Sequence, residues 1–258
     1  MKKTLITLLL LLLCAGFVHL LYEAYITPEA IRHVENARQA GESAPQTLTV
    51  ILKDVEQQIC LTLGLWCLLI MGGKFWSIWN DSHIYSIDFV GEMLEKSEEE
   101  SDEKTTLRQT MAEIEKLPQR FMDTPVVETL LSSIRRYLMT NDVHNTSEAI
   151  SLSIDGLAMR QETENTMIRF IIWAVPSIGF IGTVRGIGLA LTQADEALAG
   201  DITLMTDSLG VAFNSTLVAL CLSVALMLLL HALLRMQDGQ LIQTQAYCKK
   251  FLLNRISK

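Results

Sequence analysis

The chain has 258 residues, of which 50% are hydrophobic and 19% charged, and its mean hydropathy is positive. This balance argues against an ordinary soluble domain and against a transporter that lies almost wholly in the membrane, and it predicts spanning helices together with a water-exposed region. The formal net charge of −8 argues against a nucleic-acid partner, because no basic stripe is present to neutralise phosphates.

Four apolar segments approach the ~20 residues that a spanning helix needs. The first follows Lys2 and Lys3, and we expect an uncleaved transmembrane helix over residues 1–26, with a cleaved signal peptide as the alternative. Residues 27–55 are expected to form a periplasmic segment. The second span is expected over residues 56–79, where an aromatic cluster near the end suits a membrane interface.

A large cytoplasmic region is expected over residues 80–166. It contains an acidic run over residues 92–104, which we interpret as a solvated linker, with a docking surface for a cytoplasmic effector as the alternative. Apolar residues at helical spacing then predict two helices, one on each side of Pro118. A further helix is expected to begin near Thr146 and, because no helix breaker follows, to continue into the third span as one long helix that projects from the bilayer.

The third span is expected over residues 167–193, a periplasmic loop over 194–203, the fourth span over 204–235 and a cytoplasmic tail over 236–258. The loop has acids but no Lys or Arg, whereas Lys and Arg gather at the other ends of these two spans, so both termini are expected in the cytoplasm. The pattern predicts an all-α integral membrane protein with four transmembrane helices and long cytoplasmic helical extensions.

The third span carries residues that an ordinary lipid-facing helix does not need. Glycines let helix backbones approach closely in a membrane, and a proline frees a backbone carbonyl that a neighbour must satisfy. Helix-packing roles are therefore expected for Pro176, Gly179, Gly182 and Gly186 in the third span and for Gly210 in the fourth.

Hydroxyl groups are placed so that they can meet between the third and fourth spans. The two spans are antiparallel neighbours with a short connection, so Thr183 and Thr216 can lie at similar depth. One interpretation is that each threonine bonds to the carbonyl four residues earlier in its own helix. The other is that the hydroxyls line a wet ion pathway with Asn214 and Ser215, and the glycine, proline and polar context favours this second interpretation.

A charged residue within a span is costly and usually marks a pathway or a partner. Arg185 lies about eight residues, or ~12 Å, from the outer end of its helix. Two roles stay open for it: its side chain extends outward to Asp195 or Asp207, or it is the counter-charge to an acid on a partner protein.

Motifs of the common enzyme classes are absent from the sequence. It contains no phosphate-binding loop, no H-E-x-x-H and no G-x-S-x-G, and its five cysteines and five histidines show no metal-ligand spacing. We therefore expect no enzyme activity, no metal and no cofactor, and we expect any energy to come from an ion gradient.

The run from Pro176 to Ile187 resembles the signature P-x-x-G-[LF]-[LIF]-G-T-V-x-G-[IM] of the MotA/TolQ/ExbB family of ion-channel subunits. Residues 209–220 resemble the family's last helix, which is rich in small residues. The resemblance covers about residues 163–232. Arg185 stands at the variable position of the signature, where an aromatic residue is common in TolQ and ExbB.

The resemblance implies a stator subunit of an ion-driven motor in the bacterial inner membrane. It implies a homopentamer around a dimer of a single-span ExbD/TolR/MotB-like protein, whose membrane aspartate lies beside Thr183 and Thr216, and it implies that H⁺ or Na⁺ flow drives rotation or force. Val211 stands where ExbB-like members often have a glutamate, so no proton relay through that position carries over. A non-conducting membrane scaffold or signalling protein is the alternative function.

Overall fold

The computed structural model describes residues 2–40, 45–82, 85, 103–116 and 118–256. Residues 92–102 of the expected acidic linker lie outside the described residues. The chain divides into two compact units: the first comprises residues 1–72 and 167–231, and the second comprises residues 73–166 and 232–258.

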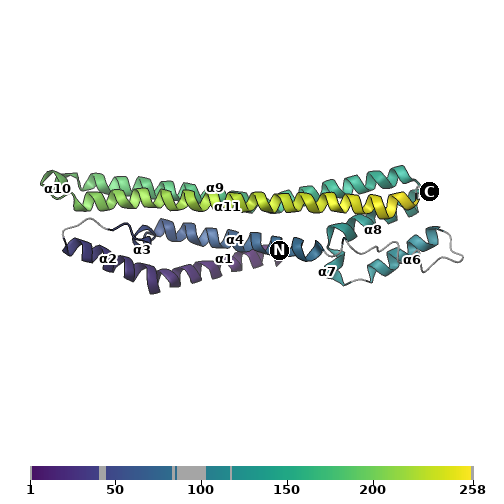
Figure 1. Cartoon of the computed structure of the whole chain (residues 1–258), viewed down its shortest axis with the longest axis horizontal. Helices are drawn as coiled ribbons and strands as arrows, with labels where there is room; N and C mark the ends of the chain where they lie inside the picture. Colours follow the sequence, from purple (N-terminus) through teal and green to yellow (C-terminus); the bar gives the residue numbers. More distant parts are fainter. Residues whose placement is uncertain (1, 41–44, 83–84, 86–102, 117, 257–258) are drawn as a thin grey trace. The chain divides into compact units, whose positions relative to one another are not determined.

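The described residues form helices and no strand, in agreement with an all-α fold (Figure 1). Within the described part of the chain, four helices are long and apolar enough to cross a membrane: Leu5–Gln39, Val55–Asp81, Val143–Thr192 and Thr203–Leu253. In chain order the elements are α1 (Lys2–Leu21), η1 (Tyr22–Ile26), α2 (Thr27–Gln39), α3 (Leu48–Ile51), α4 (Val55–Asp81), α6 (Glu103–Glu115), α7 (Gln119–Met122), α8 (Pro125–Thr140), α9 (Val143–Thr192), α10 (Ala194–Leu198), α11 (Thr203–Cys248), η3 (Lys249–Leu253) and α12 (Asn254–Ile256).

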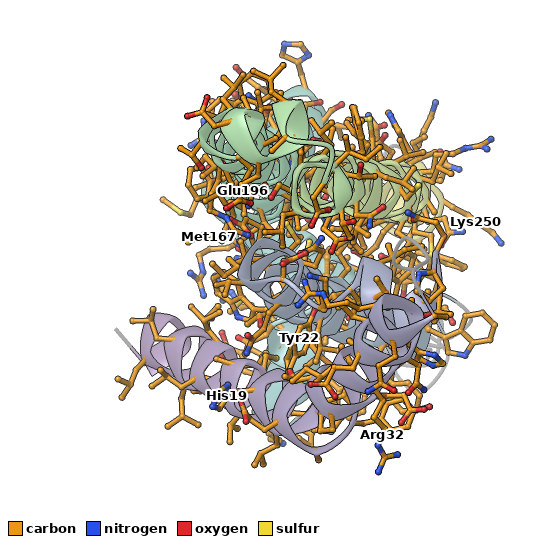
Figure 2. All side chains as sticks on the ribbon, turned by 90° about the vertical axis from the view of Figure 1, so that its left-hand side faces the viewer. His19, Tyr22, Arg32, Met167, Glu196 and Lys250 are labelled. Carbon is orange, nitrogen blue, oxygen red and sulfur yellow. The ribbon has the colours of Figure 1, made fainter. Side chains whose placement is uncertain are left out.

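The helix of the first apolar segment continues past residue 26 as far as Gln39. A π-helical turn, η1, carries the backbone from α1 directly into α2. Pro28 does not interrupt the helix, because it lies in the first turn of α2, where a missing N–H group is tolerated. Tyr22 in the π-helical turn, labelled in Figure 2, is buried in a cluster with Val18 and Ile26, and Leu61 and Leu65 of α4 pack against this cluster.

Helix α9 runs without a break for 50 residues, as the absence of a helix breaker predicts. Two residues set its beginning. Asn141, with φ of 51°, ends α8 in the left-handed conformation that asparagine tolerates. Asp142 then accepts a hydrogen bond from the backbone N–H of His144 at 2.8 Å, which satisfies one of the free donors at the start of α9.

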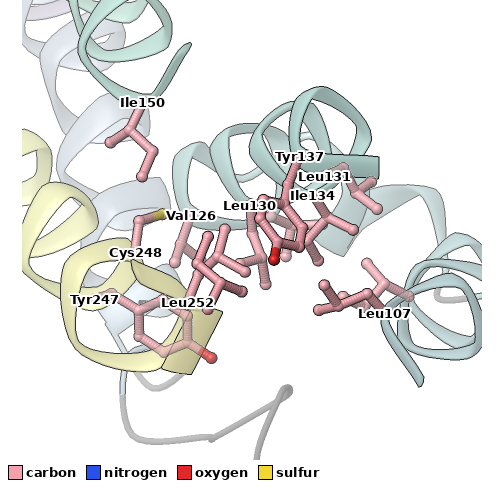
Figure 3. Close-up of a cluster of buried hydrophobic side chains, with 13 residues drawn as sticks. Leu107, Val126, Leu130, Leu131, Ile134, Tyr137, Ile150, Tyr247, Cys248 and Leu252 are labelled. Carbon is pink, nitrogen blue, oxygen red and sulfur yellow. The ribbon is translucent and has the colours of Figure 1, made fainter. Parts of the chain in front are cut away.

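The second unit has its own apolar core (Figure 3). Helix α8 supplies more of it than any other helix, because Val127, Leu130 and Ile134 recur on one face and are fully buried. The neighbouring helices contribute Leu107, Ile150 and Leu252 to the same cluster. Pro118 separates α6 from α7, as the sequence predicts, and α8 begins at Pro125 after its cap residue Thr124.

Tyr85 forms hydrogen bonds with the part of α11 that belongs to the second unit. Its hydroxyl lies 2.8 Å from Oγ1 of Thr244 and donates to the carbonyl of Gln240 at 3.3 Å. Burial raises the pKa of Tyr85 to about 12, so the hydroxyl keeps its proton at physiological pH.

Candidate ion pathway

In the first unit α9 and α11 approach so closely that three positions of α9 exclude any side chain. A Cβ atom at Gly182 would lie 2.5 Å from Cβ of Ser215, and one at Gly186 would lie 2.7 Å from the backbone nitrogen of Ala212. A Cβ at Gly179 would overlap Ala219. Carbon atoms cannot approach to these distances, so glycine at all three positions is a condition of the helix contact.

Gly210 does not belong to this contact, although the sequence places it with the packing glycines. Nothing lies within 4 Å of the position that its Cβ would occupy. It instead lines a pocket of about 110 Å³ that also involves Lys53, Asp207 and Asn214.

The close approach brings Thr183 and Thr216 together. Their hydroxyl oxygens are in direct hydrogen-bond contact across the two helices. Thr183 also reaches the carbonyl of Ala212 on α11 at 3.1 Å, and Thr216 reaches the carbonyl of Gly179 on α9 at 3.3 Å. Because each hydroxyl has a single proton, it can donate only one of these bonds at a time. The pair therefore has alternative arrangements of its protons.

Thr183 also lies 3.3 Å from the carbonyl of Gly179 in its own helix, which is the bond of the purely structural interpretation. Thr216 makes its backbone contact across the interface, to the partner helix. The structure thus contains the intrahelical bond for one threonine and cross-helix contacts for both.

Ser215 and Asn214 lie on different sides of α11. The hydroxyl of Ser215 donates to the carbonyl of Val211 at 2.8 Å and faces Gly182 and the amide of Gln57, which lies at 3.4 Å. Asn214 is also buried but faces the pocket beside Lys53. Ser215 is therefore next to the threonine pair, and Asn214 is separate from it.

Arg185 pairs with the second span, which the sequence interpretation did not foresee. Its Nε and Nη2 atoms donate to the two carboxylate oxygens of Glu56 at 2.7 and 2.8 Å, and Nη2 lies 3.9 Å from Oδ1 of Asp54. Neither expected intramolecular partner is used, since Asp207 pairs with Arg38 at 3.9 Å. Asp195 makes no contact with Arg185 in the described residues.

The ion pair has a simple structural reason. Glu56 lies in the first turn of α4 and only 8% of it is exposed, so its charge needs a partner at this depth. The two-pronged guanidinium satisfies both carboxylate oxygens at once. Burial raises the pKa of the neighbouring Asp54, and the charges of Lys53 and Arg185 oppose this effect.

Pro176 frees a carbonyl, and the structure shows which group satisfies it. Because proline has no N–H, the carbonyl of Ile172, four residues earlier, loses its helical donor. The hydroxyl of Ser223 on α11 donates to this carbonyl at 3.0 Å. The sequence analysis did not predict this role of Ser223, and a serine in an otherwise apolar stretch opposite a proline was its only signal.

Glu56 and Gln57 are the other two residues that were missed. Gln57 is fully buried, and its Nε2 atom donates to the carbonyl of Ile51 at 3.0 Å as well as reaching Ser215. The sequence contains only a weak indication of their role, which is that an acid and an amide stand directly before an apolar run. Among the described residues, no cluster of three or more His, Cys, Asp or Glu side chains could hold a metal ion.

These observations define a class: a multi-pass membrane protein in which two tightly packed spans hold a pair of hydroxyl groups between them. Residues 114–246 match the sequence profile of the MotA/TolQ/ExbB proton channel family, which confirms the resemblance. The chain belongs to this family. No curated protein and no solved structure matches it.

The close helix contact can be tested with two glycines of the same helix. Gly186→Ala is expected to lower stability by about 1–3 kcal/mol, because the new methyl group collides with the backbone of α11. Gly188→Ala is the control, since nothing lies within 4 Å of that position and helix propensity alone favours alanine by up to ~1 kcal/mol. Thermal unfolding in detergent compares the two variants, and equal melting temperatures would contradict the contact.

The role of Ser223 can be tested by a double-mutant cycle with Pro176. Ser223→Ala is expected to cost on the order of 1 kcal/mol, because it leaves the carbonyl of Ile172 without a donor. In a Pro176→Ala background the residue at position 176 regains its N–H, so the same serine change should cost much less. Unfolding free energies of the four proteins measure the coupling. Ser177→Ala is the matched control, because Ser177 bonds an ordinary carbonyl of its own helix, and a zero coupling energy for Ser223 would refute its role.

Proposed function

We propose that this chain is the channel subunit of an ion-driven motor in the bacterial inner membrane. The observation that carries the proposal is the contact of the Thr183 and Thr216 hydroxyls between two packed spans of a proton-channel family member. Because the pair has alternative proton arrangements, each hydroxyl can change the acceptor to which it donates without a movement of the backbone. The transported ion is proposed to be H⁺, with Na⁺ as the alternative, and no enzyme activity, metal or cofactor is involved.

The acid that such a pathway needs is proposed to come from another protein. Residues 167–192 of α9 contain no Asp or Glu, and in the spanning part of α11 the one acid, Asp207, lies in the second turn and is paired with Arg38. A carboxylate at the level of the threonines is then supplied by a single-span protein of the ExbD/TolR/MotB class. We propose a pentamer of this chain around a dimer of that partner.

Exposed apolar side chains on the same two helices support an assembly. Phe180 and Val184 on α9 are 65% and 60% exposed, and Phe213 and Leu217 on α11 are 65% and 54% exposed. Such residues need lipid, a neighbouring copy or a partner helix to cover them. They flank the threonine pair in sequence, so a partner helix that covers them would also reach the pathway.

The proposed orientation follows from charge. The short α10 connection carries acids, among them Glu196, and no Lys or Arg, so we place it at the periplasmic, outer end (Figure 2). Both termini and most of the second unit are then cytoplasmic. Asp54, Glu56 and Arg185 lie toward the outer end.

A non-conducting scaffold is the second function considered. The observation that favours it is that the three packing glycines and the intrahelical bond of Thr183 explain a rigid helix pair without any ion flow. In that case the threonine hydroxyls would be replaceable by groups of the same shape.

Valine substitution separates the two functions. Thr183→Val and Thr216→Val keep the side-chain shape and remove the hydroxyls, so each is expected to abolish proton flux while assembly with the partner persists. Flux is measured in vesicles that contain the chain with its partner, with an internal pH-sensitive dye, in sodium-free and sodium-containing buffer. Thr192→Val is the control, because that exposed hydroxyl bonds the carbonyl of Leu189 near the end of α9. Normal flux in both test variants would contradict the proposed pathway.

A further inference from the structure

Glu56 is a carboxylate at the edge of the threonine pathway, and it belongs to this chain. Its Cγ atom lies 3.2 Å from the position that a Cβ at Gly182 would occupy, and the hydroxyl of Ser215 lies 2.6 Å from that same position. Gly182 is one residue before Thr183. The acid of α4 therefore lies against the part of α9 that carries the pathway threonine.

Arg185, the counter-charge of Glu56, has N–H donors that do not bond to Glu56. Arg185 uses Nε and Nη2 for Glu56, and its second terminal nitrogen, Nη1, takes part in neither bond. The Arg185 side chain is 43% exposed, whereas that of Glu56 is only 10% exposed. One edge of the Arg185 guanidinium therefore bonds to Glu56, and the rest of the side chain is accessible from outside α4, α9 and α11.

Further polar atoms near Glu56 lack a partner. Oε1 of Gln57 and Oδ2 of Asp54 are buried and accept no hydrogen bond from the described residues. Both are acceptors that a water molecule or a protonated group can satisfy. The other ionisable groups around Glu56 are Arg185 on α9, Lys53 and Asp54 before α4, and Cys60 one turn further along α4. Tyr22 lies near Asp54.

We propose that Glu56 is a second proton-carrying residue of the pathway and that Arg185 exchanges between Glu56 and the partner's membrane carboxylate. This inference rests on the proposed function of the chain. It differs from that function because it places an essential acid on the channel subunit itself, in the second span.

The exchange conserves charge at each step. A proton from water at the outer end binds a carboxylate oxygen of Glu56, which becomes neutral and releases Arg185. Arg185 then pairs with the ionised carboxylate of the partner, so its positive charge stays compensated. When Glu56 passes its proton to the partner's carboxylate, Glu56 regains its charge and Arg185 returns to it. The partner's acid then releases the proton toward the cytoplasm and is ionised again for the next cycle. In both paired states the guanidinium is bound to an ionised carboxylate.

The test uses neutral variants of both members of the pair. Arg185→Gln alone leaves the negative charge of Glu56 buried without a counter-charge, so the melting temperature of the complex should fall. Glu56→Gln with Arg185→Gln removes both charges and should restore most of the melting temperature, yet proton flux in vesicles with the partner should stay at the level of empty vesicles. The matched control is Glu29→Gln with Arg32→Gln, an exposed ion pair on α2, which should leave flux unchanged.

Flux near the wild-type level in the double variant would overturn the inference, because Glu56 would then be only the counter-charge of Arg185. If the double variant does not assemble, Glu56→Asp decides: a changed pH profile of flux supports proton carriage by this residue, and an unchanged profile overturns it. Absence of flux in the wild-type complex would instead contradict the proposed function, so the two failures are distinguishable.

Discussion

The close contact of α9 and α11 is the constraint on which the rest of the site depends. Helices with ordinary side chains cannot approach to the distances found at Gly182 and Gly186. Only at this separation can the hydroxyl of Thr183 reach both Thr216 and the carbonyl of Ala212. The same approach lets Ser223 satisfy the carbonyl that Pro176 frees. The small residues thus determine where the polar groups meet, and the hydrogen bonds between these polar groups in turn stabilise the helix contact.

The second span, α4, contributes an ion pair and an amide contact to the candidate site. Glu56 binds Arg185 of α9 through two hydrogen bonds, and Gln57 reaches Ser215 of α11. Since breaking a buried ion pair leaves an uncompensated charge, these contacts hold α4 against both of the packed helices. The second span is therefore part of the candidate site, together with α9 and α11.

The sequence was sufficient for features that depend on local pattern. Apolar length predicted four spans, the lack of a breaker predicted a continuous α9, and the signature around Thr183 predicted the family. It was insufficient where a contact joins distant positions: Arg185 was assigned to acids nearby in the chain, whereas Glu56 lies 129 residues away. The continuation of the first helix past residue 26 was likewise not predicted, because it depends on the π-helical turn η1 and on the place of Pro28 in the first turn of α2.

The central claim is that the hydroxyl pair of Thr183 and Thr216 faces a carboxylate supplied by another protein. A structure of the chain purified with its single-span partner tests this claim most directly. The predicted result is a ring of copies around two partner helices, with the partner's carboxylate at the level of Thr183 and Thr216. A ring that is closed and filled by its own side chains, with no partner helix beside the threonines, would contradict the claim.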